Sequence, residues 1–262
     1  MHLGNFLISL PGWALFLLVF CYALLATQIG AFFARRRLKQ KSRDPEDSIS
    51  DIAGAMLGLL AFLLGFTFSM TATRFGDRKN HILEEANTIG TTYLRTSYLP
   101  PRQRETSRNL LREYVDLRVK LTSPEELEKY MPRFNKILQA LWLQTASLDK
   151  ENMDSEIRSL YIQSVNETID LNATRKTIVL IFRIPDPIWN CLFLLAFLSM
   201  FISGFQHHSK GTETRVGMPL LAGSFALVIV MIADMDSTGR GRLKVSQQPL
   251  LDVQQMMHEK TP

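Results

Sequence analysis

Cysteine is scarce in this sequence, and charge is missing from long stretches of it. Only 2 of the 262 residues are cysteines, which excludes a fold that depends on disulfide bonds. Residues 1–34 contain no Lys, Arg, Asp or Glu, and further charge-free runs lie near 52–73, 188–205 and 216–233. Such clustering excludes both a single soluble globule and a disordered chain.

The charge-free runs have the length of membrane-spanning helices. A bilayer core of roughly 30 Å is crossed by about 20 apolar helical residues. We therefore predict four spans, at 11–33, 52–73, 188–205 and 216–233. The first run is not a secretory signal, because its basic cluster follows the apolar residues instead of preceding them. A buried soluble helix stays open as the alternative for the third and fourth runs, which are shorter.

The section from residue 74 to residue 186 is hydrophilic and shows helical spacing without strand alternation. It carries 18 Lys and Arg against 16 Asp and Glu, so its net charge is small. Pro100-Pro101 predicts the end of one helix, and Ser123-Pro124-Glu125-Glu126 is typical of a helix start. No Gly-Pro break follows the second span, so we expect its helix to continue beyond Arg74.

The predicted fold is an all-α integral membrane protein with four transmembrane helices and a long helical domain inserted between the second and the third. The expected divisions are transmembrane helices at 1–73, the helical domain at 74–186, transmembrane helices at 187–235 and a polar tail at 236–262. Because the number of spans is even, both termini and the helical domain share one side of the membrane. Lys and Arg do not decide which side this is, since eight belong to the two short loops and nine to the opposite side.

The second span has small residues at helical spacing. They are 4, 3, 4, 4 and 3 positions apart, and they are Gly54, Gly58, Ala61, Gly65, Ser69 and Ala72. This spacing lines one face of a helix and lets another backbone approach closely. One interpretation is ordinary helix packing, with the nearby Phe62 and Phe66 facing lipid. The other is a pore-lining helix of an oligomer, in which the two phenylalanines form an apolar constriction that gates by dewetting.

Hydroxyl and basic residues follow the phenylalanines along this span. In the pore interpretation, Ser69 and Thr73 join Gly58 as lining residues. Arg74 and Arg78 then share a helix face at the end of the span, where a ring of subunits would make a positive mouth that attracts anions. The alternative is that these arginines only extend their charged ends to the membrane edge.

Other reactive residue types form no recognisable site. Adjacent Glu84 and Glu85 point in different directions on a helix, so we expect an ion pair with Arg or Lys and no catalytic acid pair. Cys21 and Cys191 fall within spans and are expected to be buried packing groups. No phosphate loop, dinucleotide fingerprint or zinc-protease motif occurs, so we predict no enzyme, cofactor or metal. A net charge of +5 fits basic membrane flanks and does not require nucleic acid.

Four stretches carry a family resemblance. Residues 64–75, LGFTFSMTATRF, resemble the second transmembrane helix of bestrophin anion channels. The stretch EEANTIGTTYLR at 84–95, Leu99-Pro100 and VSQQPL at 245–250 resemble the bacterial bestrophin-like domain family, with the similarity extending over about 50–251. The order of two spans, a helical domain and two more spans is also shared with bestrophins.

The resemblance implies a pentamer whose second helices line a pore with a hydrophobic neck. Phe62 and Phe66 fall on neck positions, whereas Gly58 stands where bestrophins carry a bulky apolar residue. The acidic calcium clasp of animal bestrophins is not matched, because Asp234-Met235-Asp236 supplies too few acids. Bestrophin topology places both termini and the helical domain in the cytoplasm, and we favour this orientation in a bacterial inner membrane.

Two functions from different classes follow. The favoured one is a homo-oligomeric, bestrophin-like channel that conducts small inorganic ions passively, with chloride or another anion implied by the resemblance. The second is a membrane-anchored interaction or sensing module, in which the helical domain recruits partners and the small residues of span two only pack. The bilayer and further copies of the chain are the expected partners.

Overall fold

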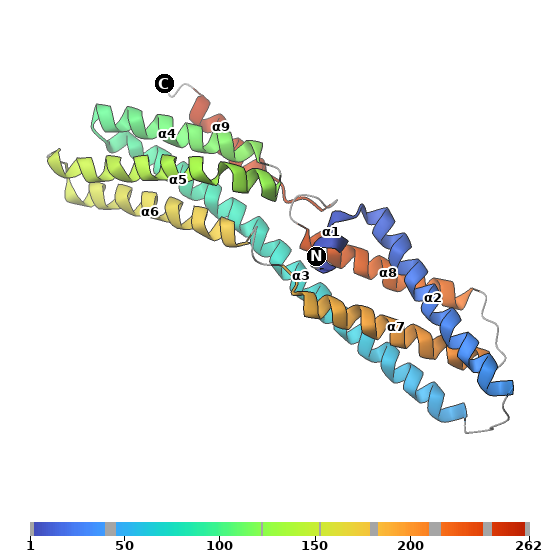
Figure 1. Ribbon diagram of the computed structural model, residues 1–262. Coiled ribbons are helices and arrows are strands. Elements are labelled where there is room, and N and C mark those ends of the chain that lie inside the picture. Colours follow the sequence, from blue (N-terminus) through green and yellow to red (C-terminus); the bar gives the residue numbers. More distant parts are fainter. Residues whose placement is uncertain are drawn as a thin grey trace. The chain divides into compact units, whose positions relative to one another are not determined.

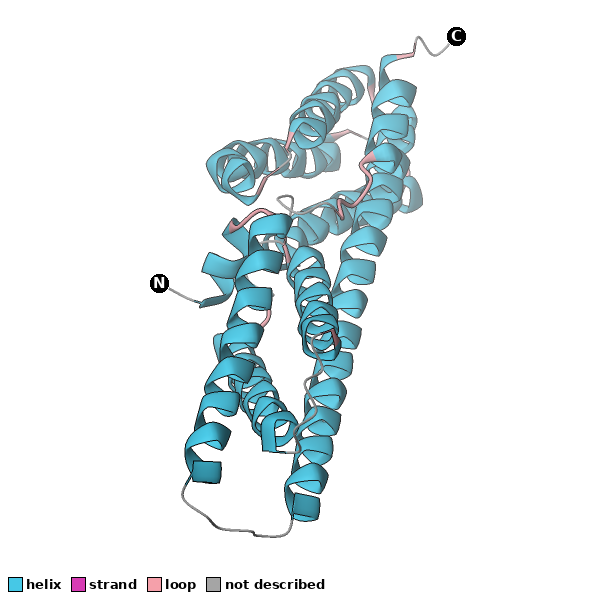
Figure 2. Cartoon of the chain, turned by 90° about the vertical axis from the view of Figure 1, so that its right-hand side faces the viewer, coloured by secondary structure: helices cyan, strands magenta, loops and turns pink. Residues whose placement is uncertain are grey.

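Helices and their connections make up the residues that the computed structural model describes, which are 3–39, 46–121, 123–151, 153–178, 183–209, 216–237 and 243–259 (Figure 2). No strand occurs within these ranges, as the predicted all-α class requires. The helices form two compact units. The membrane unit comprises Met1–Arg74 and Arg183–Leu243, and the helical unit comprises Phe75–Phe182 and Lys244–Pro262.

Among the described residues, four helices are long and apolar enough to cross a membrane. They are α2 (Gly12–Lys39), α3 (Glu46–Arg95), α7 (Asp186–Ser209) and α8 (Gly217–Asp236). Each overlaps one predicted span, so the prediction of four transmembrane helices is confirmed. Buried soluble helices do not fit α7 and α8, because Leu194 is 59% exposed and Leu220 is 65% exposed. Large apolar side chains with this much exposure are expected on helices that lipid surrounds.

Within the membrane unit, α2 packs along α7 and α8 (Figure 1). The contact with α7 is backbone against backbone. A Cβ atom added at Gly30 would lie 2.0 Å from the carbonyl oxygen of Phe201, and one added at Gly204 would lie 2.2 Å from that of Thr27. Only glycine permits such an approach, which is a common way for membrane helices to associate.

A short helix, α1 (Leu3–Ser9), precedes Pro11 and was not predicted. It packs against α7 and α8. The backbone N–H of Gly4 donates to Oδ1 of Asp186 at 3.0 Å, so the carboxylate joins α1 to the first turn of α7. Trp189, which is fully buried, packs beside Gly4.

Both cysteines are exposed on the membrane unit. The prediction that Cys21 and Cys191 are buried packing groups is therefore wrong. The physical reason is that α2 and α7 meet through their smallest residues, which turns the faces that carry the thiols outward. The charge-free runs predicted where the spans lie, but they do not show which face of each helix is buried.

The third helix, α3, is unbroken over 50 residues. The expectation that the helix of span two continues beyond Arg74 is confirmed. It contains no proline, which would remove a hydrogen bond and clash with the preceding turn. At 1.5 Å per residue it measures about 75 Å, more than twice the thickness of a bilayer core. Only its first half, up to Thr73, has the apolar composition of a membrane span.

The described part of the helical unit contains the rest of α3, four further α-helices and two short 3₁₀ helices. These are η1 (Thr96–Tyr98), α4 (Pro101–Lys120), α5 (Pro124–Ser147), α6 (Ser155–Lys176) and α9 (Gln248–His258), with η2 (Leu148–Lys150) between α5 and α6 (Figure 1). The predicted helix boundaries at Pro100-Pro101 and at Ser123 are confirmed. The Ser123 hydroxyl accepts from the N–H of Glu126, whose carboxylate accepts from the N–H of Ser123, which is a capping box.

The core of the helical unit is drawn from every long helix in it. Tyr114, Phe134 and Tyr161 are fully buried there together with Leu111 and Leu141. The tail helix α9 contributes Leu250 and Met257 to the same core. The polar tail is thus part of the packed unit, because its apolar residues recur at helical spacing.

Candidate functional site

One face of α3 is buried within the membrane unit. Ala53, Leu60, Leu64, Thr67 and Thr71 are each at most 4% exposed. Two hydrogen bonds attach this face to α7. The Ser199 hydroxyl donates to the carbonyl oxygen of Met56 at 3.1 Å, and the Gln206 amide donates to the Ser50 hydroxyl at 2.8 Å. The rotation of α3 about its own axis is therefore fixed.

The opposite face of α3 is open. Phe62 is 71% exposed and Phe66 is 60% exposed, and the remaining predicted lining residues, Gly58, Ser69 and Thr73, are exposed as well. A Cβ atom added at Gly54, Gly58 or Gly65 would meet no atom within 4 Å. The small residues of α3 are thus not used to pack this chain's own described helices, in contrast to Gly30 and Gly204. None of the described helices covers this face.

The hydroxyl groups on α3 bond mainly to their own helix. Thr73 donates to the carbonyl oxygen of Ser69 at 3.0 Å, and Thr67 donates to that of Leu63 at 2.7 Å. A threonine that donates its only hydroxyl proton in this way presents oxygen lone pairs to its surroundings. The hydroxyl oxygen of Thr73 is therefore available as an acceptor on the open face.

The two arginines predicted to form the positive pore mouth differ in their exposure. Arg74 is half-buried at the end of the membrane unit. Arg78 is only 8% exposed within the helical unit, where its guanidinium lies 5.8 Å from the ring centre of Phe75. The structure brings Gly58, Phe62, Phe66, Ser69 and Thr73 to one open face and does not bring Arg78 to it.

The exposed charges of α3 are mostly acidic. Asp51, Asp77 and Glu84 are exposed. Among the described side chains from residue 51 to residue 84, Lys79 is the one exposed basic residue. Sequence reasoning placed the important charges at Arg74 and Arg78, because helix spacing alone does not reveal which residues are buried.

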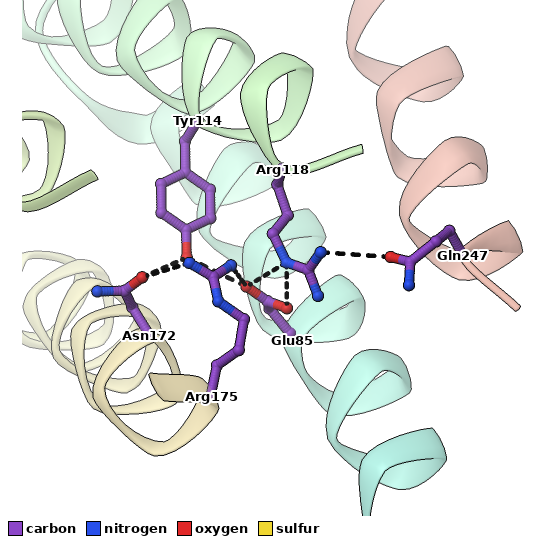
Figure 3. Close-up of polar contacts among 6 residues, drawn as sticks. All are labelled: Glu85, Tyr114, Arg118, Asn172, Arg175 and Gln247. Atoms are coloured by element: carbon purple, nitrogen blue, oxygen red, sulfur yellow. Dashed lines mark hydrogen bonds and ion pairs between the residues drawn. The ribbon is translucent and has the colours of Figure 1, made fainter. Parts of the chain in front are cut away.

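Sequence reasoning also missed a buried polar cluster in the helical unit (Figure 3). Its centre is Glu85, which is 1% exposed. Arg175 donates to Glu85 Oε1 at 2.8 Å, and Arg118 donates to Glu85 Oε2 at 3.0 Å. The expected ion pair of the Glu84-Glu85 pair is confirmed, with two arginines on the second acid.

Three more side chains complete this cluster. The hydroxyl of Tyr114 donates to Glu85 Oε1 at 3.1 Å, Arg175 donates to Asn172 at 2.7 Å, and Arg118 donates to Gln247 at 3.3 Å. Figure 3 shows these groups converging from α3, α4, α6 and the residue before α9. One carboxylate thus fixes four segments of the helical unit.

The charge state of Glu85 follows from this geometry. Burial by itself would raise the pKa of Glu85, but the guanidinium groups of Arg118 and Arg175 outweigh it and lower the pKa below the ordinary value. Burial raises the pKa of Tyr114, and the Glu85 carboxylate raises it further, so the phenol stays protonated and remains a donor. The cluster therefore keeps the Glu85 carboxylate ionised and in a fixed position. It has neither an open nucleophile nor a convergent metal-ligand set.

The tail helix α9 is attached to the helical unit by a second polar group. The Tyr93 hydroxyl and the Arg112 side chain both donate to the carbonyl oxygen of Met257, at 3.2 and 2.9 Å. Asp116 on α4 accepts from the Gln254 amide at 2.7 Å and lies 3.0 Å from His258 Nε2. These bonds hold the last described turn of the chain.

Acid should loosen this attachment. Burial opposes ionisation of Asp116, but the hydrogen bonds from Gln254 and His258 outweigh it and lower its pKa. A carboxyl group with a lowered folded-state pKa stabilises the fold above its unfolded value, near 3.9, and that stability is lost as the pH falls through the folded value. We expect the protection of α9 amides, measured relative to the intrinsic exchange rate at each pH, to fall as the pH is lowered below about 4.

At pH 7, Asp116→Asn should reproduce that loss of protection, with an effect below about 1 kcal/mol because the group is partly exposed. Asp170→Asn, an exposed acid on α6, is the control and should leave α9 unchanged. Equal exchange in both variants would show that Asp116 does not hold the tail.

Comparison with known proteins fits this architecture. The fold defines an all-helical protein whose described residues include four candidate membrane-spanning helices. A family model described as Bestrophin-like domain matches residues 20–250. The chain belongs to the Bestrophin-like domain family, which confirms the resemblance seen in the sequence. No curated protein matches the chain significantly.

Solved structures with the same fold are distant in sequence. A bacterial bestrophin homologue from Klebsiella pneumoniae with an Asp-to-Ala mutation has 11% identity and a TM-score of 0.65, covering 92% of this chain and 97% of its own. An Ile-to-Ala mutant of a bestrophin homologue from the same organism has 12% identity and a TM-score of 0.63, over 94% and 97%. A structure described as a membrane protein has 14% identity and a TM-score of 0.65, over 94% and 98%. At these identities the likeness is one of fold.

Proposed function

We propose that the protein is a homo-oligomeric ion channel whose α3 helices surround a shared axis and line the ion path. The observation that carries this proposal is the open face of α3, where Phe62 and Phe66 are more than half exposed and three glycines meet nothing from the part of the chain that the structure describes. Family membership and the fold support it, because the resemblance to bestrophins implies this helix as the pore helix.

Each proposed part has a physical role. Rings of Phe62 and Phe66 from several copies form an apolar constriction that water leaves readily, and this closes the path to ions. Gly58 leaves the path wider one turn earlier, and Ser69 and Thr73 offer oxygen atoms beyond the constriction. A pentamer is the assembly that the resemblance implies. We place the helical unit and both termini in the cytoplasm and the spans in a bacterial inner membrane.

The sign of the conducted ion is a separate part of the proposal. Anion conduction is implied by the resemblance, and half-buried Arg74 supports it. Cation conduction is the second candidate, favoured by the exposed Asp51, Asp77 and Glu84 on α3 and by the lone pairs of Thr73. The reversal potential in a potassium chloride gradient across a planar bilayer separates the two, because its sign depends on which ion carries the current.

Trimming the constriction should increase conduction. In liposomes that hold the purified protein, Phe62→Ala and Phe66→Ala should each raise ion flux severalfold, because a wider and less apolar neck stays hydrated. Leu220→Ala removes an equally exposed apolar side chain from α8 and should leave flux unchanged.

The opposite result has a clear meaning. If wild type and both phenylalanine variants are silent, and light scattering shows a monomer or dimer, no pore is enclosed. The protein would then be a membrane-anchored interaction module, in which a partner covers the α3 face.

A further inference from the structure

A stripe of exposed side chains on α2 ends at an arginine. Leu25 is 62% exposed, Ile29 is 39% exposed and Phe32 is 49% exposed, and Arg36 follows on the same face. The successive spacings of 4, 3 and 4 residues place all of them on one side of the helix. The other side of α2 is buried against α7 through Gly30, so this stripe faces away from the packed helices.

Trp13 at one end of α2 and the arginines that follow Phe32 at the other mark the two edges of the hydrocarbon core. Trp13, which is 64% exposed, stands 19 positions before Phe32. At 1.5 Å per residue this separation is about 29 Å, which matches the thickness of a bilayer core. Tryptophan prefers the headgroup level, and Arg35 and Arg36 are the first charged residues after the apolar run. Arg35 and Arg36 are therefore at the depth of lipid phosphates, and Phe32 lies one turn deeper, in the hydrocarbon core.

The guanidinium of Arg36 is held in place at this depth. It lies 4.5 Å from the ring centre of Phe32, in a cation–π contact. The neighbouring Phe33 packs against Phe201 of α7 at 5.9 Å, which fixes this end of α2. Arg35 is exposed beside Arg36, and α2 contains no Asp or Glu that would neutralise either one.

We propose that this surface binds one anionic phospholipid, with its phosphate on Arg35 and Arg36 and an acyl chain along Phe32, Ile29 and Leu25. The lengths agree, because Leu25 to Arg36 spans about 16 Å and half a bilayer core is about 15 Å. Guanidinium groups suit phosphate oxygens because they donate in pairs. The inference concerns α2 alone and does not depend on whether α3 lines a pore.

Lipid binding to the full-length protein tests this directly. Native mass spectrometry from a neutral detergent, with phosphatidylglycerol or phosphatidylcholine added, measures how many lipids each protomer retains. Wild type should hold phosphatidylglycerol more tightly than phosphatidylcholine. Arg35→Gln with Arg36→Gln should weaken phosphatidylglycerol binding about 25-fold, since each basic residue near an anionic lipid contributes about fivefold.

A charge-matched variant separates a site from general attraction. Arg102→Gln with Lys136→Gln removes two exposed cations from the helical unit and should leave phosphatidylglycerol binding as in wild type. The proposal is overturned if this variant loses as much binding as the α2 variant, or if the α2 variant binds like wild type. Equal retention of the two lipids by wild type, or equally tight binding of free glycerol phosphate, would also overturn it.

Discussion

Glu85→Gln should destabilise the folded protein by about 3–5 kcal/mol, because it leaves two buried arginines without their counter-charge. Arg118 and Arg175 both donate to this carboxylate, and Arg175 is 1% exposed. Neither arginine can move to water without opening the core. The measurement is equilibrium unfolding of the full-length protein in detergent, followed by circular dichroism.

The neighbouring acid provides the matched control. Glu84 is exposed on the same helix, so Glu84→Gln should change the free energy of unfolding by no more than about 0.5 kcal/mol. If the two variants were equally stable, the cluster in Figure 3 would be a minor contact. It would then not be the centre of the helical unit.

Gly204→Val should disrupt the membrane unit by more than about 3 kcal/mol, beyond the usual cost of overpacking a core. An added Cβ atom would lie 2.2 Å from the carbonyl oxygen of Thr27. Because the obstacle is backbone, the two helices must separate and lose the contact between α2 and α7. Loss of monodisperse protein from detergent extracts, or a lower unfolding midpoint, measures the effect.

Glycines of α3 should respond differently. Gly58→Ala places its Cβ in open space within the chain, so the stability of a single protomer should be unchanged. Its effect is expected in assembly or ion flux, where another copy covers the face. If Gly204→Val were tolerated as well as Gly58→Ala, the close contact of α2 and α7 would be disproved.

Helix positions were predictable from the sequence because their causes are local. Charge-free runs are forced into helices by the membrane, and the unbroken run past Arg74 follows from the absence of proline. The capping box at Ser123 is likewise a four-residue pattern. The α2 and α7 contact had a local signal that was overlooked, since Ala26, Gly30 and Ala34 recur every four residues.

Burial was harder to predict than helix position. The sequence identified the face of α3 that carries Phe62 and Phe66, and the structure shows it open. Arg78 has the same chemistry as an exposed basic residue, yet it is only 8% exposed in the structure. The partners of Glu85 lie 33 and 90 positions away along the chain, so no local sequence pattern predicts them.

Cysteine accessibility tests most directly whether the open face of α3 meets water. Cys21 and Cys191 are exposed and replaceable by alanine, which gives a background without thiols. Into it, Ser69→Cys and the lipid-facing Leu25→Cys are introduced separately, and the protein in liposomes is treated with a membrane-impermeant thiol reagent. We predict that the cysteine at position 69 is modified and ion flux falls, whereas the one at position 25 stays unmodified. A cysteine at position 69 that is as unreactive as that at position 25 would place this face in lipid and contradict the channel.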